Sequence, residues 1–412
     1  MGIILNKEQR YIVDEAVKFY KHSSEQVFQF AGYAGTGKSV VLNAIFYELG
    51  IPLHRVAPMS YIGQASVVMR LKGLTNAKTI HSWLFRPVET FKLDEYGNVI
   101  KDSYFNRPKT ELTFEPKPLE NIDIVAIDEA GSVPYELKHE IESRNKKIIA
   151  TGDLGQLPPV YGKPAYLYDG KVHNLTKIMR QAEGSSLLYL ADRSRKGLPI
   201  HEGYYGDVLV INEDDLTDEM IAGSDIVLVG KNATRDIINR KVRRDILNIK
   251  TDLPSYGERV VCRKNNWNVE VDGINLANGL IGTVINMPGV HGFDGKTYKI
   301  DFQPSFMNTY FKELSCDYNY LIADHKQKQL MKNNRYNQGE KFEFAYAITT
   351  HMSQGAQFNN GIYIEEYLGK DIQNNLNYTG ITRFSQSMIY VKKKRRFYWF
   401  QDTKYLVSWT RL

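Results

Sequence analysis

The sequence predicts an α/β fold in which two doubly wound parallel sheets follow one another along the chain. Apolar runs of strand length alternate with amphipathic helical stretches, and the loops after the strands are polar. This alternation occurs twice, on either side of residues 175–200. A length of 412 residues agrees with two or three domains.

The first unit opens with a helix, followed by a strand, a turn and a second helix. Apolar residues recur at helical spacing from Asn6 to Tyr20. The segment VFQFAGYAGTGKSVVLNAIFYEL then predicts a strand, a glycine-rich turn and an amphipathic helix. Further strands are predicted in LHRVAPMS, in the apolar run IDIVAIDEA and in KKIIATGDLGQLPPV, which ends in a polar loop.

The second unit repeats this style. DIVLVGKNATRDIINRKVRR predicts a strand, a turn and a helix, and FAYAITTHMSQGAQF predicts a strand, a loop and a candidate helix. NNGIYIEE predicts a further strand. NYTGITRFSQSMIYVKKK predicts the end of a helix, a loop and the last strand.

Two stretches interrupt the alternation. Residues 85–118 contain YGN between mixed polar and apolar residues, which indicates a β-hairpin. Residues 257–340 are rich in Gly, Asn, Tyr and Phe and hold short alternating runs such as GERVVCRKN and TYKIDF. They predict a small β-subdomain inserted in the second unit.

Composition favours a reduced, cytoplasmic chain, or a viral protein that acts in the host cytoplasm. Cys262 and Cys316 are far apart in the sequence, which argues against a disulfide framework and a zinc site. No stretch approaches the roughly 20 apolar residues of a membrane helix, and the N-terminus does not resemble a signal peptide. The net charge of +6 permits nucleic-acid binding without requiring it.

A nucleotide site is predicted in the glycine-rich turn. The sequence there fits G-x-x-x-x-G-K-[ST], a pattern in which backbone amides, a lysine and a hydroxyl surround phosphates and Mg²⁺. The preceding strand and following helix argue against a chance glycine-rich turn. The residues assigned to ATP are Gly32, Gly35, Thr36, Gly37, Lys38 and Ser39.

Two acids end the predicted strand IDIVAIDEA. After a phosphate-binding loop, Asp128 is expected to hold Mg²⁺ together with Ser39, and Glu129 is expected to polarise the attacking water. The alternative is a solvated helix N-terminus that happens to carry two acids.

Further strings occur in a recognisable order: LNKEQ at 5–9, APMS at 57–60, TIHS at 79–82, GDLGQLPP at 152–159, ITTHMSQG at 348–355 and YTGITR at 378–383. In these strings the chain resembles superfamily 1 helicases, within them the RecD-like and Dda-like group. The resemblance runs from residue 5 to about residue 390. The GDLGQLPP and YTGITR strings are its most specific parts.

The resemblance implies roles for residues outside the phosphate-binding loop. Gln9 would read adenine, and Gln156 would sense the γ-phosphate. Arg180, which follows Leu175-Thr176, would reach the γ-phosphate, and Arg383 would be the arginine finger. The catalytic set is therefore Lys38, Glu129, Gln156, Arg180 and Arg383, with ATP and Mg²⁺ as cofactors.

DNA contacts are implied in both units by the same resemblance. They are Pro58, Ser60, Thr79, His81, Ser82, Thr350, His351 and Ser353. The chain departs from many relatives at Met352, where a basic residue is common, and at Gln357, where a glutamate is common. Tyr61-Ile62 replace a run of small residues. These departures bear on a phosphate contact and on a ribose or coupling contact, and they leave the hydrolytic residues intact.

The resemblance also implies the domain organisation. Two tandem RecA-like P-loop domains would comprise residues 1–84 with 119–174, and 175–256 with 341–412. Residues 85–118 would form a strand-separating pin, with Phe91 or Tyr96 stacking on the first base pair, and residues 257–340 an SH3-like β-subdomain. The basic run at 392–396 is open to three interpretations, as a localisation signal, a DNA-binding patch or a solvated strand edge.

The predicted function is an ATP-dependent DNA helicase and translocase that moves 5′→3′, a polarity implied by the resemblance alone. Its expected partners are single-stranded and fork DNA, with a single-strand-binding protein or replication, repair and recombination factors as further candidates, and the expected state is a monomer. Alternatives are an RNA or RNA–DNA motor, a single-strand-binding module with a regulatory ATP site, and a P-loop switch or kinase. The last of these leaves ITTHMSQG and YTGITR unexplained.

Overall fold

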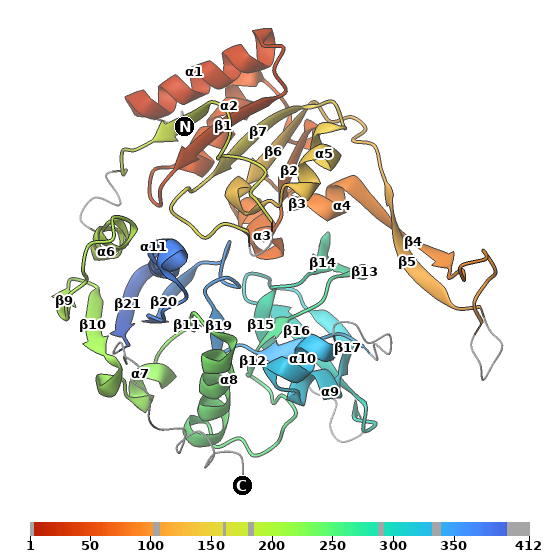
Figure 1. Ribbon diagram of the computed structural model, residues 1–412, viewed down its shortest axis with the longest axis vertical. Helices are drawn as coiled ribbons and strands as arrows, with labels where there is room; N and C mark the ends of the chain where they lie inside the picture. The colour runs from red at the N-terminus through yellow and green to blue at the C-terminus, as the bar shows by residue number, and fades with distance from the viewer. Residues whose placement is uncertain are drawn as a thin grey trace.

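A computed structural model gives the structure of residues 4–101, 108–159, 162–179, 185–286, 292–331 and 339–393. Figure 1 shows a parallel sheet at the top, a second parallel sheet below it, an antiparallel sheet beside the second, and a long hairpin that projects from the body. None of the helices in these ranges has the length and apolar character of a membrane span.

The first sheet is fully parallel and has the order β3-β2-β6-β7-β1-β8. Its helices cover both faces: α1, α2 and α3 share one apolar core, and α4 and α5 share the other. The strands are β1 (Val27–Gly32), β2 (Val56–Ser60), β3 (Lys78–Thr79), β6 (Ile124–Asp128), β7 (Lys147–Gly152) and β8 (Val172–Leu175). The helices are α1 (Lys7–His22), α2 (Lys38–Leu49), α3 (Gly63–Leu71), α4 (Ile80–Leu84) and α5 (Glu136–Glu142), with short 3₁₀ turns at Leu53–Arg55 and Ala130–Ser132.

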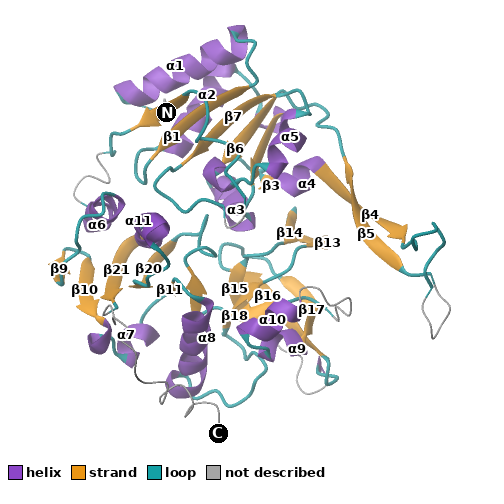
Figure 2. Cartoon of the chain, viewed as in Figure 1, coloured by secondary structure: helices purple, strands orange, loops and turns teal. Residues whose placement is uncertain are grey.

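The second sheet has the order β19-β11-β20-β21-β10-β9, and only its edge strand β9 runs antiparallel to its neighbour. Helices α6 and α11 pack on the face toward the first sheet, and α7 and α8 contribute to another core (Figure 2). The strands are β9 (Gly203–Tyr205), β10 (Val208–Asn212), β11 (Val227–Val229), β19 (Ala347–Thr349), β20 (Phe358–Ile364) and β21 (Phe384–Lys392). The helices are α6 (Ser186–Arg195), α7 (Asp218–Ala222), α8 (Asn232–Lys241) and α11 (Lys370–Ile381), with a 3₁₀ turn at Glu213–Asp215 and a short π-helix at Val242–Ile246.

A five-stranded antiparallel sheet, of order β17-β16-β15-β12-β18, lies within the second unit. It is formed by β12 (Arg259–Cys262), β15 (Ile281–Asn286), β16 (Thr297–Pro304), β17 (Phe311–Asp317) and β18 (Phe342–Phe344), so its edge strand falls beyond residue 340. The accompanying elements are the hairpin β13 (Asn266–Val271)–β14 (Ile274–Leu276) and helices α9 (Tyr318–Ile322) and α10 (His325–Met331).

A second hairpin pairs β4 (Phe85–Phe91) with β5 (Thr110–Pro116) in antiparallel register. Beyond this ladder the chain turns at Tyr96-Gly97, where Gly97 has φ of 83°. The hairpin therefore forms where the YGN sequence predicted one. One local prediction is wrong: the candidate helix after His351 is a series of turns through Gly355, held by short-range bonds such as Ser353 N to Thr350 O.

Candidate active site

The phosphate-binding loop joins the end of β1 to the start of α2. Gly35 and Gly37 adopt φ of 79° and 86°, and a Cβ on Gly37 would lie 2.5 Å from Nε2 of Gln9. Gln9 is fully buried and donates from Nε2 to the carbonyl of Thr36 at 3.0 Å. Glycine is thus required at Gly37 both for the left-handed backbone and for the approach of Gln9. The predicted adenine reader is tied directly to the loop.

Lys38 begins α2, and its ammonium turns back over the loop. Nζ donates to the carbonyl of Gly32 at 2.7 Å and lies 3.9 Å from Oδ2 of Asp153. Asp153 is 4% exposed, and burial raises the pKa of its carboxyl while the Lys38 charge partly offsets this. The ammonium therefore stands between the phosphate loop and the loop after β7.

The two predicted acids lie at the carboxyl end of β6. Oδ1 of Asp128 accepts from the backbone N–H of Glu129 at 2.9 Å, and Glu129 has the left-handed φ of 51°, uncommon for a residue with a side chain. Burial, followed by the neighbouring Glu129 charge, raises the pKa of Asp128, with Lys72 and Lys38 opposing. Because burial disfavours the charged form of Asp128, a cation bound next to this side chain would stabilise its carboxylate.

The residues near Asp128 provide donors suited to Mg²⁺. The ammonium of Lys72, which follows α3, donates to Oγ of Ser39 at 3.3 Å and is also the largest positive influence on Asp128. The ammonium of Lys72 therefore interacts with both Ser39 and Asp128. A hydroxyl and a carboxylate are hard oxygen donors, which fit this cation.

Gln156 lies on the loop after β7, beside the acid pair. Its Nε2 is 3.5 Å from Oε1 of Glu129, and its side chain is buried. One long, weak hydrogen bond therefore joins the loop after β7 to the acid pair.

Helix α11 of the second sheet docks on this same loop. The hydroxyl of Tyr378 donates to Oδ2 of Asp153 at 2.7 Å and accepts from the backbone N–H of Ala34 at 2.8 Å. A Cβ on Gly155 would lie 2.8 Å from the Tyr378 ring, so only glycine permits this approach. Oγ1 of Thr379 accepts from the N–H of Leu157 at 2.9 Å. One turn of α11 thus connects the second sheet with both phosphate-facing loops of the first.

Arg383 follows α11 and is 6% exposed. Its Nε donates to the carbonyl of Thr379 and its Nη1 to that of Ala356, each at 3.3 Å, and Nη2 donates to Oγ1 of Thr382 at 3.4 Å. These bonds are long and go to neutral acceptors, so they are weaker than charge-paired bonds. The guanidinium is held near Tyr378, which itself contacts the loops beside Lys38.

Several side chains at this interface were absent from the predicted set. Asp153 and Tyr378 lie inside the GDLGQLPP and YTGITR strings, so the motif order already pointed to them. Arg195 of α6 lies 4.0 Å above the ring of Tyr33 and donates to its hydroxyl at 3.1 Å. Arg195 and Lys72 belong to none of the quoted strings. Arg180, predicted to reach the γ-phosphate, lies outside the described residues.

Four of the predicted DNA contacts have buried side chains. Pro58 and Ser60 lie within β2, every residue of which is buried. Oγ1 of Thr350 donates to the carbonyl of Val229 at 3.1 Å, and Oγ of Ser353 donates to the carbonyl of Thr350 at 2.8 Å. The hydroxyls of Thr350 and Ser353 thus donate to backbone carbonyls inside the protein. The assignment of all four residues to DNA remains a prediction.

The other four predicted DNA contacts are partly accessible. Oγ1 of Thr79 caps α4 by accepting from the N–H of Ser82 at 3.2 Å, and the two hydroxyls lie 2.9 Å apart. Burial lowers the pKa of both His81 and His351, which favours neutral imidazoles at pH 7. These residues can offer hydrogen bonds to phosphates rather than fixed charge.

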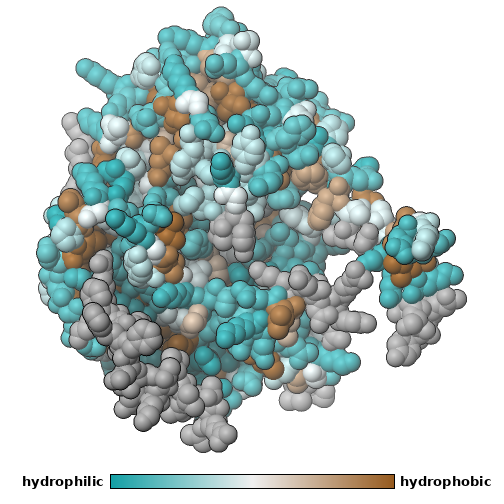
Figure 3. All heavy atoms as spheres, viewed as in Figure 1, coloured by the Kyte–Doolittle hydropathy of each residue, from teal (hydrophilic) through white to brown (hydrophobic). Residues whose placement is uncertain are grey.

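The projecting hairpin exposes large apolar side chains, and Figure 3 shows apolar residues gathered on it. Phe91 is 57% exposed and Tyr96 is 81% exposed. On the other strand, the ring of Phe114 meets that of Trp267 edge-on at 6.4 Å, which connects this hairpin with the β13–β14 hairpin. Both predicted stacking residues are thus accessible.

The fold and this site together define a P-loop nucleoside triphosphatase with two RecA-like domains. A family model described as an AAA domain matches residues 4–207. The resemblance drawn from the motifs is thereby confirmed at the level of the fold, which this chain shares with Pif1 helicases.

Solved structures similar to this chain include three of Pif1 helicases. Bacteroides Pif1 bound to single-stranded DNA has a TM-score of 0.56 and 18% identity, over 94% of this chain and 92% of that chain. A structure of two coordinating Pif1 helicases at forked DNA gives 0.54 and 18%, with the same coverage of 94% and 92%. Pif1 from Candida albicans gives 0.52 and 16%, over 95% of this chain and 94% of that chain.

A sequence relative comes from Methanocaldococcus jannaschii, whose matching protein is named as uncharacterized. It is 24% identical over 87% of this chain. The match spans only 36% of that longer relative.

Proposed function

We propose that the protein is an ATP-dependent DNA helicase that moves 5′→3′ on single-stranded DNA and unwinds duplexes. The observation that carries the proposal is the connection from the second domain to both phosphate-facing loops, made by Tyr378 and Thr379. A contact of this kind makes the relative position of the domains depend on what the loops bind.

In this proposal ATP lies between the domains. The loop amides and Lys38 hold the phosphates, Gln9 faces the adenine, and Glu129 orients the attacking water. Ser39 and Asp128 would hold Mg²⁺, which when bound neutralises charge on the β- and γ-phosphates. The loop from Gly32 to Ser39 would supply backbone N–H groups that surround the phosphates, and the ammonium of Lys38 would supply the positive charge beside them.

Arg383 would complete the site on closure. Its present bonds go to carbonyls and a hydroxyl, so a phosphoryl oxygen would be a stronger acceptor. An arginine finger is typically worth about 10³–10⁵ in turnover rate. Gln156, now in weak contact with Glu129, would report the γ-phosphate to α11 through the loop after β7.

Translocation would follow from alternating grip by the two domains. His81 with Ser82 in one domain, and His351 in the other, would hydrogen-bond phosphates without reading sequence. The β4–β5 hairpin would divide the strands of a fork, with Phe91 or Tyr96 stacking on the first base pair for about 1–3 kcal/mol. The structures of DNA-bound Pif1 relatives support such a nucleic-acid path.

Two assays on the full chain test the proposal. Phosphate release should rise on adding single-stranded DNA, and duplexes with a 5′ tail should be unwound in preference to those with a 3′ tail. Greater stimulation by RNA oligonucleotides would indicate an RNA motor. ATP turnover that stays flat on adding either nucleic acid would instead indicate a binding module with a regulatory nucleotide site.

A further inference from the structure

One glutamine joins the N-terminus of α1 to the phosphate-binding loop. Gln9 is fully buried, and its Nε2 donates to the carbonyl of Thr36 at 3.0 Å. Its Oε1 accepts from the backbone N–H of Asn6 at 3.0 Å. A carbonyl needs a donor and an N–H needs an acceptor, so these two backbone partners fix the orientation of the amide. Both ends of the Gln9 side chain are therefore bonded to the protein itself.

Asn6 completes a reciprocal cap at the start of α1. Its Oδ1 accepts from the backbone N–H of Gln9 at 2.9 Å, which makes a capping box. Its Nδ2 lies 3.5 Å from Sδ of Met179, and Nε2 of Gln9 lies 3.1 Å from the same sulfur. A thioether is a weak acceptor, so the two amide donors are only partly satisfied by it.

Met179 lies beside the loop and packs against Gln9. Its backbone N–H donates to the carbonyl of Gly35 at 3.0 Å. The side chains of Met179 and Asn6 are half-buried, whereas Gln9 has no accessible surface. A ligand on this side of the loop therefore meets Met179 and Asn6, and it reaches Gln9 only if one of these two residues moves.

Recognition of adenine requires more than this arrangement offers. Adenine presents an amino donor at N6 beside the N7 acceptor, whereas guanine presents acceptors at both O6 and N7. A glutamine or asparagine reads adenine by using both ends of its amide, the oxygen on N6 and the nitrogen on N7. Here Oε1 of Gln9 and Oδ1 of Asn6 both accept from backbone N–H groups of α1. Nδ2 of Asn6 can still donate to N7, which the two purines share, and a thioether packs against any aromatic ring.

We propose that the nucleotide site accepts GTP as readily as ATP. The purine packs on Met179, and Nδ2 of Asn6 donates to N7 of either base. Gln9 stands behind Met179 and positions the phosphate-binding loop without touching the base. The inference rests on the proposed function in one respect, the placement of a nucleoside triphosphate on the loop after β1.

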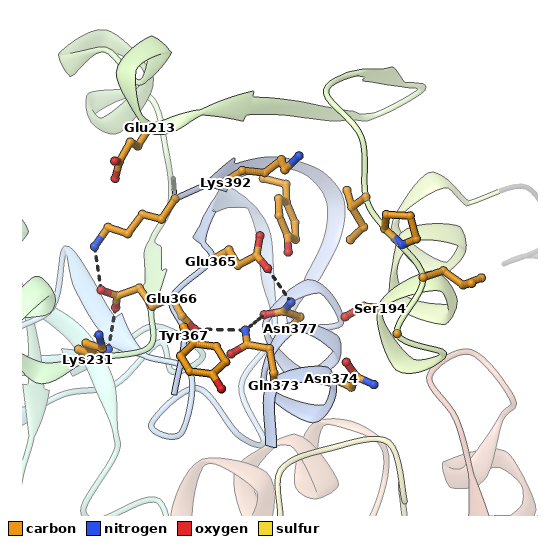
Figure 4. A pocket seen from close by; sticks show the side chains of 16 residues that line it. Ser194, Glu213, Lys231, Glu365, Glu366, Tyr367, Gln373, Asn374, Asn377 and Lys392 are labelled. Carbon is orange, nitrogen blue, oxygen red and sulfur yellow. Dashed lines mark hydrogen bonds and ion pairs between the residues drawn. The ribbon is translucent and has the colours of Figure 1, made fainter. Parts of the chain in front are cut away.

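A cavity of about 1130 Å³ at the carboxyl edge of the second sheet does not offer an equivalent phosphate site (Figure 4). The backbone N–H groups of Gly230 and Lys231, before α8, donate to Oε2 of Glu366 at 2.9 and 2.8 Å. Nζ of Lys393 also pairs with Oε1 of Glu366 at 2.8 Å. The helix N-terminus that would attract a phosphate thus already holds the protein's own carboxylate. Nucleotide affinities should therefore report the loop after β1.

Competition binding to the full chain, without nucleic acid, tests the proposal. Fluorescent ATP labelled on the ribose is bound first and is then displaced by unlabelled ATP or GTP. We expect the two dissociation constants to agree within about fivefold, since a bidentate contact to a base typically discriminates by about 5–150-fold. A larger preference for either nucleotide would overturn the proposal and leave the proposed ATPase intact. If labelled ATP did not bind at all, the proposed ATPase would fail as well.

Two variants separate positioning of the loop from recognition of the base. Gln9→Ala should weaken the binding of ATP and GTP by the same factor, because both need the loop. A loss confined to ATP would show that Gln9 reads adenine, contrary to the proposal. Met179→Ala uncovers the two amide donors, which complement N7 and O6 of guanine, so the preference should shift several-fold toward GTP. A shift toward ATP would contradict the assigned donors. The control is Lys21→Ala, exposed at the other end of α1, which should leave both dissociation constants unchanged.

Discussion

Replacing Tyr378 with phenylalanine removes one hydroxyl from the contact between the two domains. That hydroxyl accepts from the N–H of Ala34 at 2.8 Å and donates to Asp153 at 2.7 Å. A neutral hydrogen bond contributes about 0.5–1.5 kcal/mol, and one to a charged group about 1.5–3 kcal/mol. Because the two bonds share one atom, their energies do not simply add. We expect Tyr378→Phe to weaken the docked arrangement of the two domains, in which Tyr378 contacts Ala34 and Asp153, by about 2–3 kcal/mol.

A loss of this size is large on the scale of a domain equilibrium. A free-energy change of about 1.4 kcal/mol changes an equilibrium constant tenfold, so the ratio of docked to undocked molecules should fall about 30-fold or more. The assay is energy transfer between dyes on Tyr47→Cys in the first domain and Leu198→Cys in the second, both exposed positions. The transfer efficiency should drop in nucleotide-free Tyr378→Phe and recover in part with a non-hydrolysable ATP analogue.

Tyr363→Phe is the matched control. Its hydroxyl is buried within the second domain and donates to Oδ1 of Asn377 at 2.7 Å, away from the first domain. This variant should lose stability against urea while keeping the energy-transfer distribution of the unmodified protein. If Tyr378→Phe also kept that distribution, the hydroxyl would not hold the domains together, and the reasoning would be wrong.

Three further predictions concern the nucleotide, the hairpin and pH. Lys38→Ala should abolish phosphate release yet bind single-stranded DNA with unchanged anisotropy, and normal turnover would refute its role. Phe91→Ala with Tyr96→Ala should slow duplex unwinding and spare translocation along single strands; an equal loss of both would count against a pin. Because burial lowers the folded-state pKa of His351 below its ordinary value near 6.5, the unfolded chain binds more protons below that pH, and stability falls as pH drops. His351→Asn should therefore reduce the difference between urea midpoints at about pH 7.5 and 5.5, and an unchanged difference would contradict the burial argument.

Much of the fold was predictable because its determinants are local. The alternation of apolar strands and helices, the glycine-rich turn and the YGN turn each specify backbone geometry within a few residues. The strand ending in Asp128-Glu129 and the hairpin from Phe85 were accordingly placed correctly. The prediction of a helix after His351 was wrong because a short apolar pattern is compatible with a helix and with turns. Tertiary contacts decide between these two conformations.

The site was less predictable because its partners are distant in sequence. Asp153 and Tyr378 are 225 residues apart, and no local pattern reveals that their side chains meet. The burial of Thr350 was unpredictable for the same reason. Its hydroxyl donates to the carbonyl of Val229, which lies on strand β11, 121 residues earlier in the chain. Arg195 ends α6 and Lys72 follows α3, so both residues reach the site because these helices pack beside it. Short sequence motifs carry no information about such packing.

The central claim is that one triphosphate is clamped between Lys38 of the first domain and Arg383 of the second. Single-turnover hydrolysis by Arg383→Ala, measured together with its affinity for ATP, tests this most directly. We predict ATP affinity within about tenfold of the unmodified protein and a hydrolysis rate lower by about 10³-fold or more. A variant that hydrolyses ATP at the unmodified rate would show that the second domain contributes nothing to the reaction, and would contradict the account.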